Sequence, residues 1–239
     1  MNPIKQNQSV TISFFRYHGI KKVWGMMQML TSRRPMRKSK GLLFFKPLGT
    51  GSGAGYSSIP DFSVYGMLAV WENHTFAAEF LSSPLFGRFI QNSNEQFTVF
   101  LNPISSRGSW SGFDKWKFSE PGADNQLICA LTRATLRLRF MSKFWSLVPS
   151  VSKEHKSHRG LLFSKGIGEY PWIEQATFSI WENTESLDEF ANNTFHRVAI
   201  DEARKCNGFK EEMFTRLKPY HTEGTWQGNN PLRGYLKDL

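Results

Sequence analysis

The sequence has little cysteine and no long apolar run. Cys129 and Cys206 are the two cysteines among 239 residues, and their spacing fits neither a disulfide framework nor a cysteine zinc site. No segment approaches the roughly 18 consecutive apolar residues of a membrane-spanning helix, and the first residues lack the apolar core of a secretion signal. We therefore expect reduced thiols and a soluble, cytoplasmic protein that is able to touch a membrane surface.

Acidic residues are also in the minority. The chain has 20 Asp and Glu against 30 Lys and Arg, which gives a net charge of +10. A basic surface attracts nucleic acid, an acidic protein partner or an acidic membrane leaflet. The basic residues are not interleaved with stacking aromatics on a recognised nucleic-acid module, so we expect no nucleic-acid partner. The basic turn predicted at residues 33–38 is expected to meet an acidic membrane or an acidic redox partner.

Motifs for hydrolysis are missing as well. The sequence has no acidic pair, nucleophile elbow or Cys/His dyad that rises above chance. Aromatic residues, in contrast, make up 15% of the chain. This exceeds the usual demand of packing a small domain and suggests a large apolar pocket or partner surface.

The chain contains an internal repeat. GLLFFK at 41–46 returns as GLLFSK at 160–165, WEN at 71–73 returns at 181–183, and GSWSG at 108–112 returns as GTWQG at 224–228. The signatures keep their order, at offsets of 119, 110 and 116 residues. We therefore divide the chain into two ferredoxin-like repeats, 1–120 and 121–239, and expect the second to carry the functional site.

Hydrophobic periodicity predicts strand, helix, strand, strand, helix, strand in each repeat. In the first repeat the expected elements are a strand at 10–14, a helix from residue 24, strands at 41–48 and 64–71, a helix at 76–91 interrupted at Pro84, and a strand at 97–104. In the second they are a strand at 127–136, a helix at 140–148, strands at 160–166 and 176–181, a helix at 187–206 and a strand at 213–220. This βαββαβ order is the ferredoxin-like motif of α+β proteins, and two fused copies can bury their open sheet faces against each other. We predict a dimeric α+β barrel within one chain.

A glycine-rich segment at 49–55 superficially suggests a phosphate cradle. A dinucleotide fingerprint opens a helix after a parallel strand, and here the next predicted element is a strand. A flexible hairpin loop is the favoured interpretation, with a flap over a pocket as the alternative. Because the second repeat lacks this insertion, the asymmetry favours one functional site over two.

His196 has the most informative context among the six histidines. Its helix is predicted to place Ala199, Ile200 and Ala203 on the histidine's own face, where small neighbours leave room for a flat group. The aligned residue of the first repeat is Phe86, so an aromatic core position in one copy is an imidazole in the other. A hydrogen-bonded core histidine and a metal or haem ligand both fit this pattern.

Other candidates have weaker patterns. His155 and His158 lie in a basic stretch predicted to be a solvated loop, and Cys206 at the end of the His196 helix is an alternative thiolate ligand. Arg133 belongs to the first strand of the second repeat. A salt-bridged strand end is its ordinary interpretation, and an inward-facing hydrogen-bond donor to an oxygen species or a substrate is the functional one.

A set of motifs carries a family resemblance: FFK at 44–46 with the loop at 49–56, the strand at 64–71, GSWSG at 108–112 and LTRAT at 131–135. Together they resemble the spheroidene monooxygenase family of carotenoid ketolases, over about residues 13–231. The resemblance implies a haem-dependent oxygenase with dioxygen and an external electron donor such as a ferredoxin. The implied reaction hydroxylates an activated C–H position of a long apolar polyene and then oxidises it to a ketone.

The architecture also resembles haem-binding α+β barrels such as chlorite dismutases, dye-decolourising peroxidases and aldoxime dehydratases, which carry the proximal histidine in the C-terminal unit. By that analogy we expect His196 to ligate the iron of a b-type haem, with Arg133 as the distal catalytic group. A haem peroxidase or an aldoxime-dehydratase-like enzyme, neither of which needs a reductase, is one alternative. A non-catalytic carrier of haem or of an apolar ligand is another.

Overall fold

The computed structural model describes residues 7–53, 57, 59–120, 126–170, 172–192 and 194–236. The first repeat follows the predicted order, with the helix break at Pro84 separating two helices. Ser83 caps the second of these by accepting a hydrogen bond from the Phe86 N–H, and Pro84 occupies its first turn. The elements are β1 (Ser9–Arg16), α1 (Lys21–Thr31), α2 (Arg33–Met36), β2 (Leu42–Gly51), β3 (Pro60–Trp71), α3 (His74–Leu81), α4 (Pro84–Asn92) and β4 (Glu95–Gly108).

The second repeat has the same order of elements, except that a single helix between its first two strands takes the place of α1 and α2. They are β5 (Ile128–Leu136), α5 (Leu138–Ser157), β6 (Leu161–Gly168), β7 (Glu174–Trp181), α6 (Thr184–Asn192), α7 (Thr194–Lys205) and β8 (Phe209–Gly224). The proposed boundary between 120 and 121 adjoins residues 121–125, which lie outside the described ranges, as do residues 54–56 and 58 of the glycine-rich loop. The described ends of that loop belong to the β2–β3 hairpin, as predicted.

Three local predictions need correction. The single helix predicted at 187–206 is divided into α6 and α7. The basic segment 33–38 was expected to be a turn, and it begins with the short helix α2. The solvated loop predicted around His155 is wrong, because α5 continues through it and His155 is 1% exposed. Val148, Ser152 and His155 are all buried at helical spacing, and the His155 ring lies 4.7 Å from that of Phe190.

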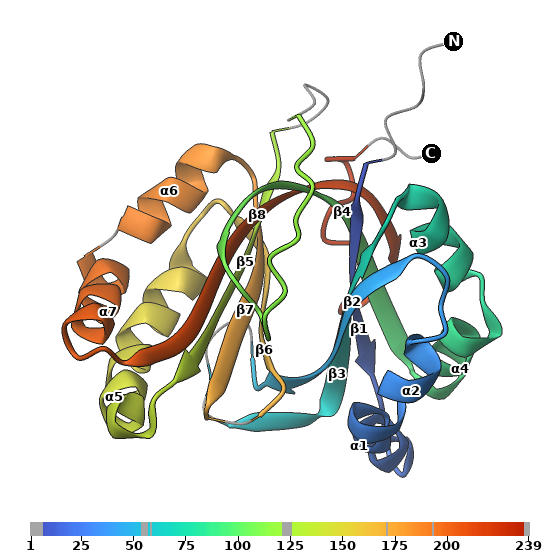
Figure 1. Cartoon of the computed structure of the whole chain (residues 1–239), viewed down its shortest axis with the longest axis horizontal. Helices are drawn as coiled ribbons and strands as arrows, with labels where there is room; N and C mark the ends of the chain where they lie inside the picture. Colours follow the sequence, from blue (N-terminus) through green and yellow to red (C-terminus); the bar gives the residue numbers. More distant parts are fainter. Residues whose placement is uncertain are drawn as a thin grey trace.

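All the strands close into an antiparallel barrel in the order β1-β3-β2-β6-β7-β5-β8-β4. Helices of the first repeat cover one side of the barrel and those of the second cover the other (Figure 1). The barrel interior is packed by both repeats: Phe163 lies 5.3 Å from Phe14 and 5.4 Å from Phe97, measured between ring centroids. The dimeric α+β barrel predicted from the repeat is therefore confirmed.

The two seams between the repeats differ in length. Strands β4 and β8 pair along residues 97–108 and 213–224, whereas β2 and β6 pair at Gly49–Gly168 and Thr50–Ile167. The long seam ties the repeats together. Across the short seam the neighbouring segments separate, and side chains from both repeats surround the space between them.

The repeated glycine–tryptophan turns, at 108–112 and 224–228, form hydrogen bonds across the long seam. Glu211 on β8 accepts hydrogen bonds from the backbone N–H groups of Ser111 and Gly112, both at 3.1 Å. At the equivalent position of the first repeat, Glu95 on β4 accepts a 2.8 Å hydrogen bond from the Gly228 N–H. Each turn is thus held by a glutamate of the other repeat, which gives the two motifs a structural role. Among the described helices, none is long and apolar enough to cross a membrane.

Candidate functional site

The space between the helices and the sheet is filled in the first repeat. Aromatic side chains of α3 and α4 pack against aromatic side chains on the outer face of β1, β3 and β4, and each of these rings is at most 5% exposed. The rings are Phe15, Trp71, Phe80, Phe86, Phe89 and Phe100. Such close packing excludes a ligand from this layer.

The corresponding layer of the second repeat contains a cavity of about 480 Å³, which we call the helix–sheet cavity. This volume lies within the range of about 300–1,000 Å³ that is common for small-molecule sites. Strands β4, β5, β7 and β8 form one wall, and α6 and α7 form the other. The lining residues important here are Arg107, Thr132, Thr177, Ser179, Ile200 and Arg216.

The two repeats carry different side chains at several equivalent positions of this layer, and Thr177 and Arg216 are the exchanged residues that line the cavity. Ser9 pairs with Trp71 on β1 and β3 as Ile128 pairs with Trp181 on β5 and β7, which fixes the equivalent positions. At each of them a large side chain of the first repeat is replaced by a small or polar one. From the first repeat to the second, the exchanges are Phe15 to Ala134, Met67 to Thr177 and Phe100 to Arg216. On the helices, the sequence offset of 110 aligns Phe86 with His196 and Phe89 with Ala199, which gives two more exchanges.

The predicted haem-binding residues have different placements. Ile200 lines the helix–sheet cavity, whereas Ala203 is buried in a separate cluster with Leu136 and Phe140. The side chains of His196 and Ala199 lie outside the described residues. The backbone of α7 sets position 196 one helical turn before Ile200.

Arg133 does not reach this cavity. It is at the position of β5 that corresponds to Phe14 of β1, and its side chain is 2% exposed. Because side chains alternate along a strand, Arg133 lies on the barrel side of β5, whereas its neighbour Thr132 lines the helix–sheet cavity. Arg133 forms an ion pair with Glu211 and a second, at 3.2 Å, with Glu174. The structure therefore does not bring Arg133 together with the His196 helix.

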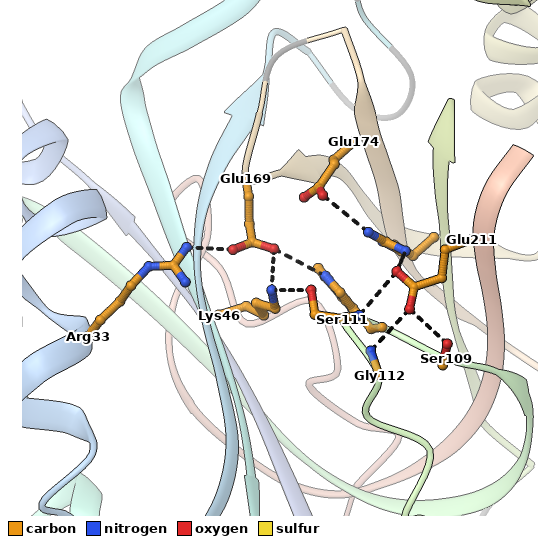
Figure 2. Close-up of polar contacts among 10 residues, drawn as sticks. Arg33, Lys46, Ser109, Ser111, Gly112, Glu169, Glu174 and Glu211 are labelled. Atoms are coloured by element: carbon orange, nitrogen blue, oxygen red, sulfur yellow. Dashed lines mark hydrogen bonds and ion pairs between the residues drawn. The ribbon is translucent and has the colours of Figure 1, made fainter. Parts of the chain in front are cut away.

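These ion pairs belong to a polar network at the barrel side of the sheet, drawn in Figure 2. Glu169 accepts hydrogen bonds at 2.5 Å from both Arg33 and Lys46, and Lys46 also donates to Ser111 Oγ at 2.7 Å. The Trp110 indole N–H donates to Glu169 at 3.2 Å. The cluster thus compensates buried charges from both repeats.

The carboxylates of this network differ in their proton affinities. Partial burial raises the pKa of Glu211, but hydrogen bonds from Ser109, Gly112 and Ser111 and the charge of Arg133 outweigh it and lower the pKa to about 2. For Glu169 the raising effect of burial is likewise outweighed by Lys46 and Arg33, which lower its pKa. Burial and the neighbouring Glu169 raise the pKa of Glu174.

A cavity of about 360 Å³ opens at the short seam, and we call it the seam cavity. Its apolar wall comes from α1, β3, α5 and the β6–β7 turn, and includes Met27, Leu30, Phe62, Trp145 and Trp172. Its polar lining residues include Asp61, Glu169 and Glu174. Both repeats build this site, which the sequence analysis did not anticipate.

The two cavities approach each other on β7. Gln175 lines the seam cavity and Thr177 lines the helix–sheet cavity. Positions two apart on a strand share one face and lie about 7 Å from each other. Residues that line the two cavities are therefore neighbours on one face of β7.

The remaining histidines and cysteines show other arrangements. His74 stacks on Tyr220 at 4.3 Å and hydrogen-bonds with Asn102 at 2.7 Å, while the His221 ring lies 5.1 Å from Phe100. Cys129 is buried in the barrel and Cys206 is exposed. Within the described residues, no cluster of three or more His, Cys, Asp or Glu side chains is placed to hold a metal ion. The sequence analysis did not identify Arg107 and Arg216 as candidates. The offset of 116, which aligns Arg216 with Phe100, is the signal that could have found Arg216.

Sequence comparison finds close relatives along nearly the whole chain. No protein-family model matches it. The spheroidene monooxygenase of Rhodobacter capsulatus is 34% identical over 228 residues, covering 93% of this chain and 94% of the relative. The chain belongs to the spheroidene monooxygenase family. Two more members, from Cereibacter sphaeroides and Rubrivivax gelatinosus, are 35% and 31% identical and cover 94% and 87% of the chain, and 71% and 80% of their own lengths.

The fold of this family member is shared with enzymes of another name. An aldoxime dehydratase superposes with a TM-score of 0.56 at 10% identity, covering 92% of this chain and 83% of that one. A second, crystallised with butyraldoxime, has a TM-score of 0.61 at 8% identity and covers 97% and 87%. At these identities the likeness concerns the fold alone.

Proposed function

We propose that this chain is a haem-dependent monooxygenase that oxidises an apolar, carotenoid-like substrate. Dioxygen supplies the oxygen atom, and an external donor such as a ferredoxin supplies electrons. Each hydroxylation inserts one oxygen atom into a C–H bond, while electrons and protons reduce the other atom to water. A second oxidation at the same carbon gives a ketone after loss of water.

The observation that carries this proposal is the difference between the helix–sheet layers. Thr177 and Arg216 line the cavity of the second repeat at the positions where the first repeat has Met67 and Phe100, and the sequence offset aligns His196, on the helix that forms its wall, with Phe86. A flat cofactor needs such a slot, and a neutral imidazole is a common axial ligand of haem iron. When bound there, haem supplies the activation of dioxygen.

The lining residues fit haem in further respects. Arg107 and Arg216 line the cavity and offer guanidinium groups to the two carboxylates of the macrocycle. Arg216 pairs with Asp188 and Arg107 lies 4.4 Å from the Phe214 ring, so both are already oriented. Leu187, Phe190 and Ile200 provide apolar contact and exclude water.

Hydrogen-bond donors on the sheet side come from hydroxyl groups. Thr132, Thr177 and Ser179 line that wall, and Ser179 Oγ is oriented by a 2.9 Å hydrogen bond from the Trp181 indole. These hydroxyls would hydrogen-bond polar atoms of a ligand in the cavity, a role that Arg133 on the other face of β5 does not share. Arg133 instead holds Glu174 at the seam cavity and is a positioning residue.

An absorption spectrum of the purified, haem-loaded chain tests the cofactor. A Soret band that appears on loading establishes haem binding, and its position after reduction under carbon monoxide separates histidine from thiolate ligation. A chain that takes up no haem would contradict the proposal.

Turnover with a carotenoid, labelled dioxygen and a ferredoxin system tests the reaction. A monooxygenase incorporates the label and needs the reductant. Turnover with peroxide or an aldoxime and no reductant would favour the peroxidase or dehydratase alternative. Haem binding with no turnover under any of these conditions would favour a carrier.

A further inference from the structure

Helix α1 has an apolar face that no residue in the described part of the chain covers. Ile20 at its N-cap is 82% exposed, and Val23, Met27 and Leu30 are 50%, 45% and 76% exposed. Their spacing of three, four and three residues aligns them on one side of the helix. An exposed stripe of this kind on a helix of a folded protein indicates an interaction surface.

The other side of α1 is firmly seated on the barrel. A Cβ atom at Gly25 would lie 2.8 Å from Tyr17 and 2.9 Å from Tyr65, so the glycine permits a very close approach. Trp24 packs against Phe89 at 5.3 Å between ring centroids. The exposed face is therefore held in a fixed orientation.

The apolar surface continues around the mouth of the seam cavity. Phe62, Tyr170 and Trp172 are 63%, 60% and 50% exposed, and all line this cavity together with Met27 and Leu30. We call the residues Ile20, Val23, Met27, Leu30, Phe62, Tyr170 and Trp172 the apolar rim. Tyr and Trp are favoured at membrane–water interfaces because each combines an apolar ring with a polar group.

The backbone at Trp172 is strained. Its φ of 65° is in the left-handed region, which costs about 1–3 kcal/mol for a bulky residue. Its carbonyl oxygen accepts a 3.3 Å hydrogen bond from the Trp145 indole, which helps to hold the turn. The strained turn keeps an indole ring half exposed at the cavity mouth.

Positive charge is concentrated beside the apolar rim. Residues 1–60 contain ten Lys and Arg and no Asp or Glu, whereas the remaining residues contain 20 of each sign. The whole net charge of the chain therefore originates in this segment. Lys21, Lys22, Arg34, Arg37 and Lys38 are exposed on and after α1. Each basic residue near an anionic bilayer contributes about 1 kcal/mol to binding.

We propose that the apolar rim and the basic residues of α1 and α2 dock the chain on an anionic lipid bilayer, so that the seam cavity opens into the membrane. The apolar side chains then enter the interface while the lysines and arginines remain at the headgroups. An apolar chain can leave the bilayer through this mouth and extend along β7 toward Thr177. The identity of that chain rests on the proposed function, but the membrane contact does not.

Sedimentation with lipid vesicles tests the docking directly, without haem or substrate. The full-length chain is mixed with phosphatidylcholine vesicles that contain or lack phosphatidylglycerol, at low and at high salt. We expect binding to the anionic vesicles that weakens with salt. Absence of binding to anionic vesicles at low salt would overturn the proposal.

Two variants separate the apolar and the charged contributions. Val23→Glu with Leu30→Glu should weaken vesicle binding by at least about tenfold, because two apolar contacts are lost. Neutralising Lys21, Lys22, Arg34 and Arg37 with Gln should weaken it on the order of a thousandfold. Val198→Glu and Arg204→Gln on α7, at the other end of the molecule in Figure 1, are the matched controls and should bind as the parent does.

Fluorescence locates the bound surface. Bilayers with brominated acyl chains should quench part of the tryptophan emission, and Trp172→Phe should remove most of that quenched part, unlike Trp226→Phe. Vesicle binding that survives Val23→Glu with Leu30→Glu unchanged would overturn docking through the apolar rim and leave adsorption by charge alone. Haem spectra of all these variants are recorded in parallel: a parent-like spectrum in a variant that has lost vesicle binding shows that docking and the proposed function fail separately.

Discussion

The two repeats have the same order of strands and a pair of helices after the third strand, but they differ in what lies between those helices and the sheet. Under α3 and α4 the space is occupied by phenylalanine and tryptophan, with Phe86 fully buried. Under α6 and α7 a cavity of about 480 Å³ remains, walled by hydroxyl groups, arginines and a few apolar side chains. One repeat can thus serve as a packed scaffold while its copy is free to bind a ligand.

The difference also shows how a repeat protein acquires a site without a change of fold. Substituting large core side chains by small ones normally destabilises a domain. In this barrel the long β4–β8 seam and the shared interior connect both repeats, so packing in the first can offset the cavity in the second. A cofactor that fills the cavity would restore the lost contacts.

Cutting the chain between the repeats should have the largest effect. Fragments 1–120 and 121–239 each lose half of the barrel interior and the β4–β8 pairing, which exposes an apolar sheet face. We expect insoluble fragments that become soluble when they are co-expressed, measured by fractionation and gel filtration. Two stable monomeric fragments would contradict a shared core.

Phe86 and His196 occupy equivalent positions of the two repeats, so alanine variants at these positions should differ in haem binding and in stability. His196→Ala should abolish haem binding, since a methyl group cannot ligate iron. Phe86→Ala should keep the haem and lose about 3–5 kcal/mol of unfolding free energy through the cavity it leaves. Haem per chain and urea denaturation measure the two effects. A six-coordinate, parent-like spectrum in folded His196→Ala would refute the ligand assignment and turn attention to His221 or Cys206.

The hydrogen bonds between Glu211 and the turn at 108–112 should make the stability of the fold depend on pH. The pKa of Glu211 falls from 4.5 to about 2 on folding, so its contribution is complete above about pH 4.5 and is lost as the pH falls toward 2. Replacement by Gln should reduce the unfolding free energy by about 2 kcal/mol at pH 6 and by much less near pH 2. Denaturation at several pH values measures this. Glu185→Gln, at an exposed position of α6, should show no such trend.

Returning a first-repeat residue to the second repeat should close the helix–sheet cavity. Thr177→Met introduces the residue found at the equivalent Met67. We expect haem affinity to fall by about tenfold and the apo chain to gain about 1 kcal/mol of stability, because the added side chain fills empty space. Haem titration and thermal denaturation provide the readouts. If Thr177→Met bound haem more tightly than the parent and were less stable, haem would not bind in the helix–sheet cavity.

The smallest effect is expected at the arginines of this cavity. Arg216 is partly exposed, so its pairing with a haem carboxylate should contribute less than about 1 kcal/mol. Arg216→Gln should therefore weaken haem binding severalfold without displacing the axial ligand. Haem titration at low and high salt checks this, with Arg204→Gln on α7 as the control. Equal affinities for Arg216→Gln and the parent would remove the proposed carboxylate contact.

Much of the fold could be read from local patterns. Strand alternation, helical spacing and the order of repeated motifs predicted the ferredoxin-like units and their fusion into one barrel. The predicted break at Pro84 is present because proline fits the first turn of a helix and Ser83 supplies the cap. Composition did not predict that His155 is buried, because the surrounding lysines resemble a solvated loop while α5 turns one face of that segment inward.

Short-range periodicity and alignment of the repeats were enough to predict the order of the strands and which helix carries an imidazole in place of a phenylalanine. What each side chain contacts depends on how distant segments pair. The sequence offers Arg133 as a hydrogen-bond donor at an oxygen site, but strand pairing places it inside the barrel against Glu174 and Glu211. The seam cavity likewise exists because α1, α5 and the short β2–β6 pairing converge from both repeats, a contact that no local pattern encodes.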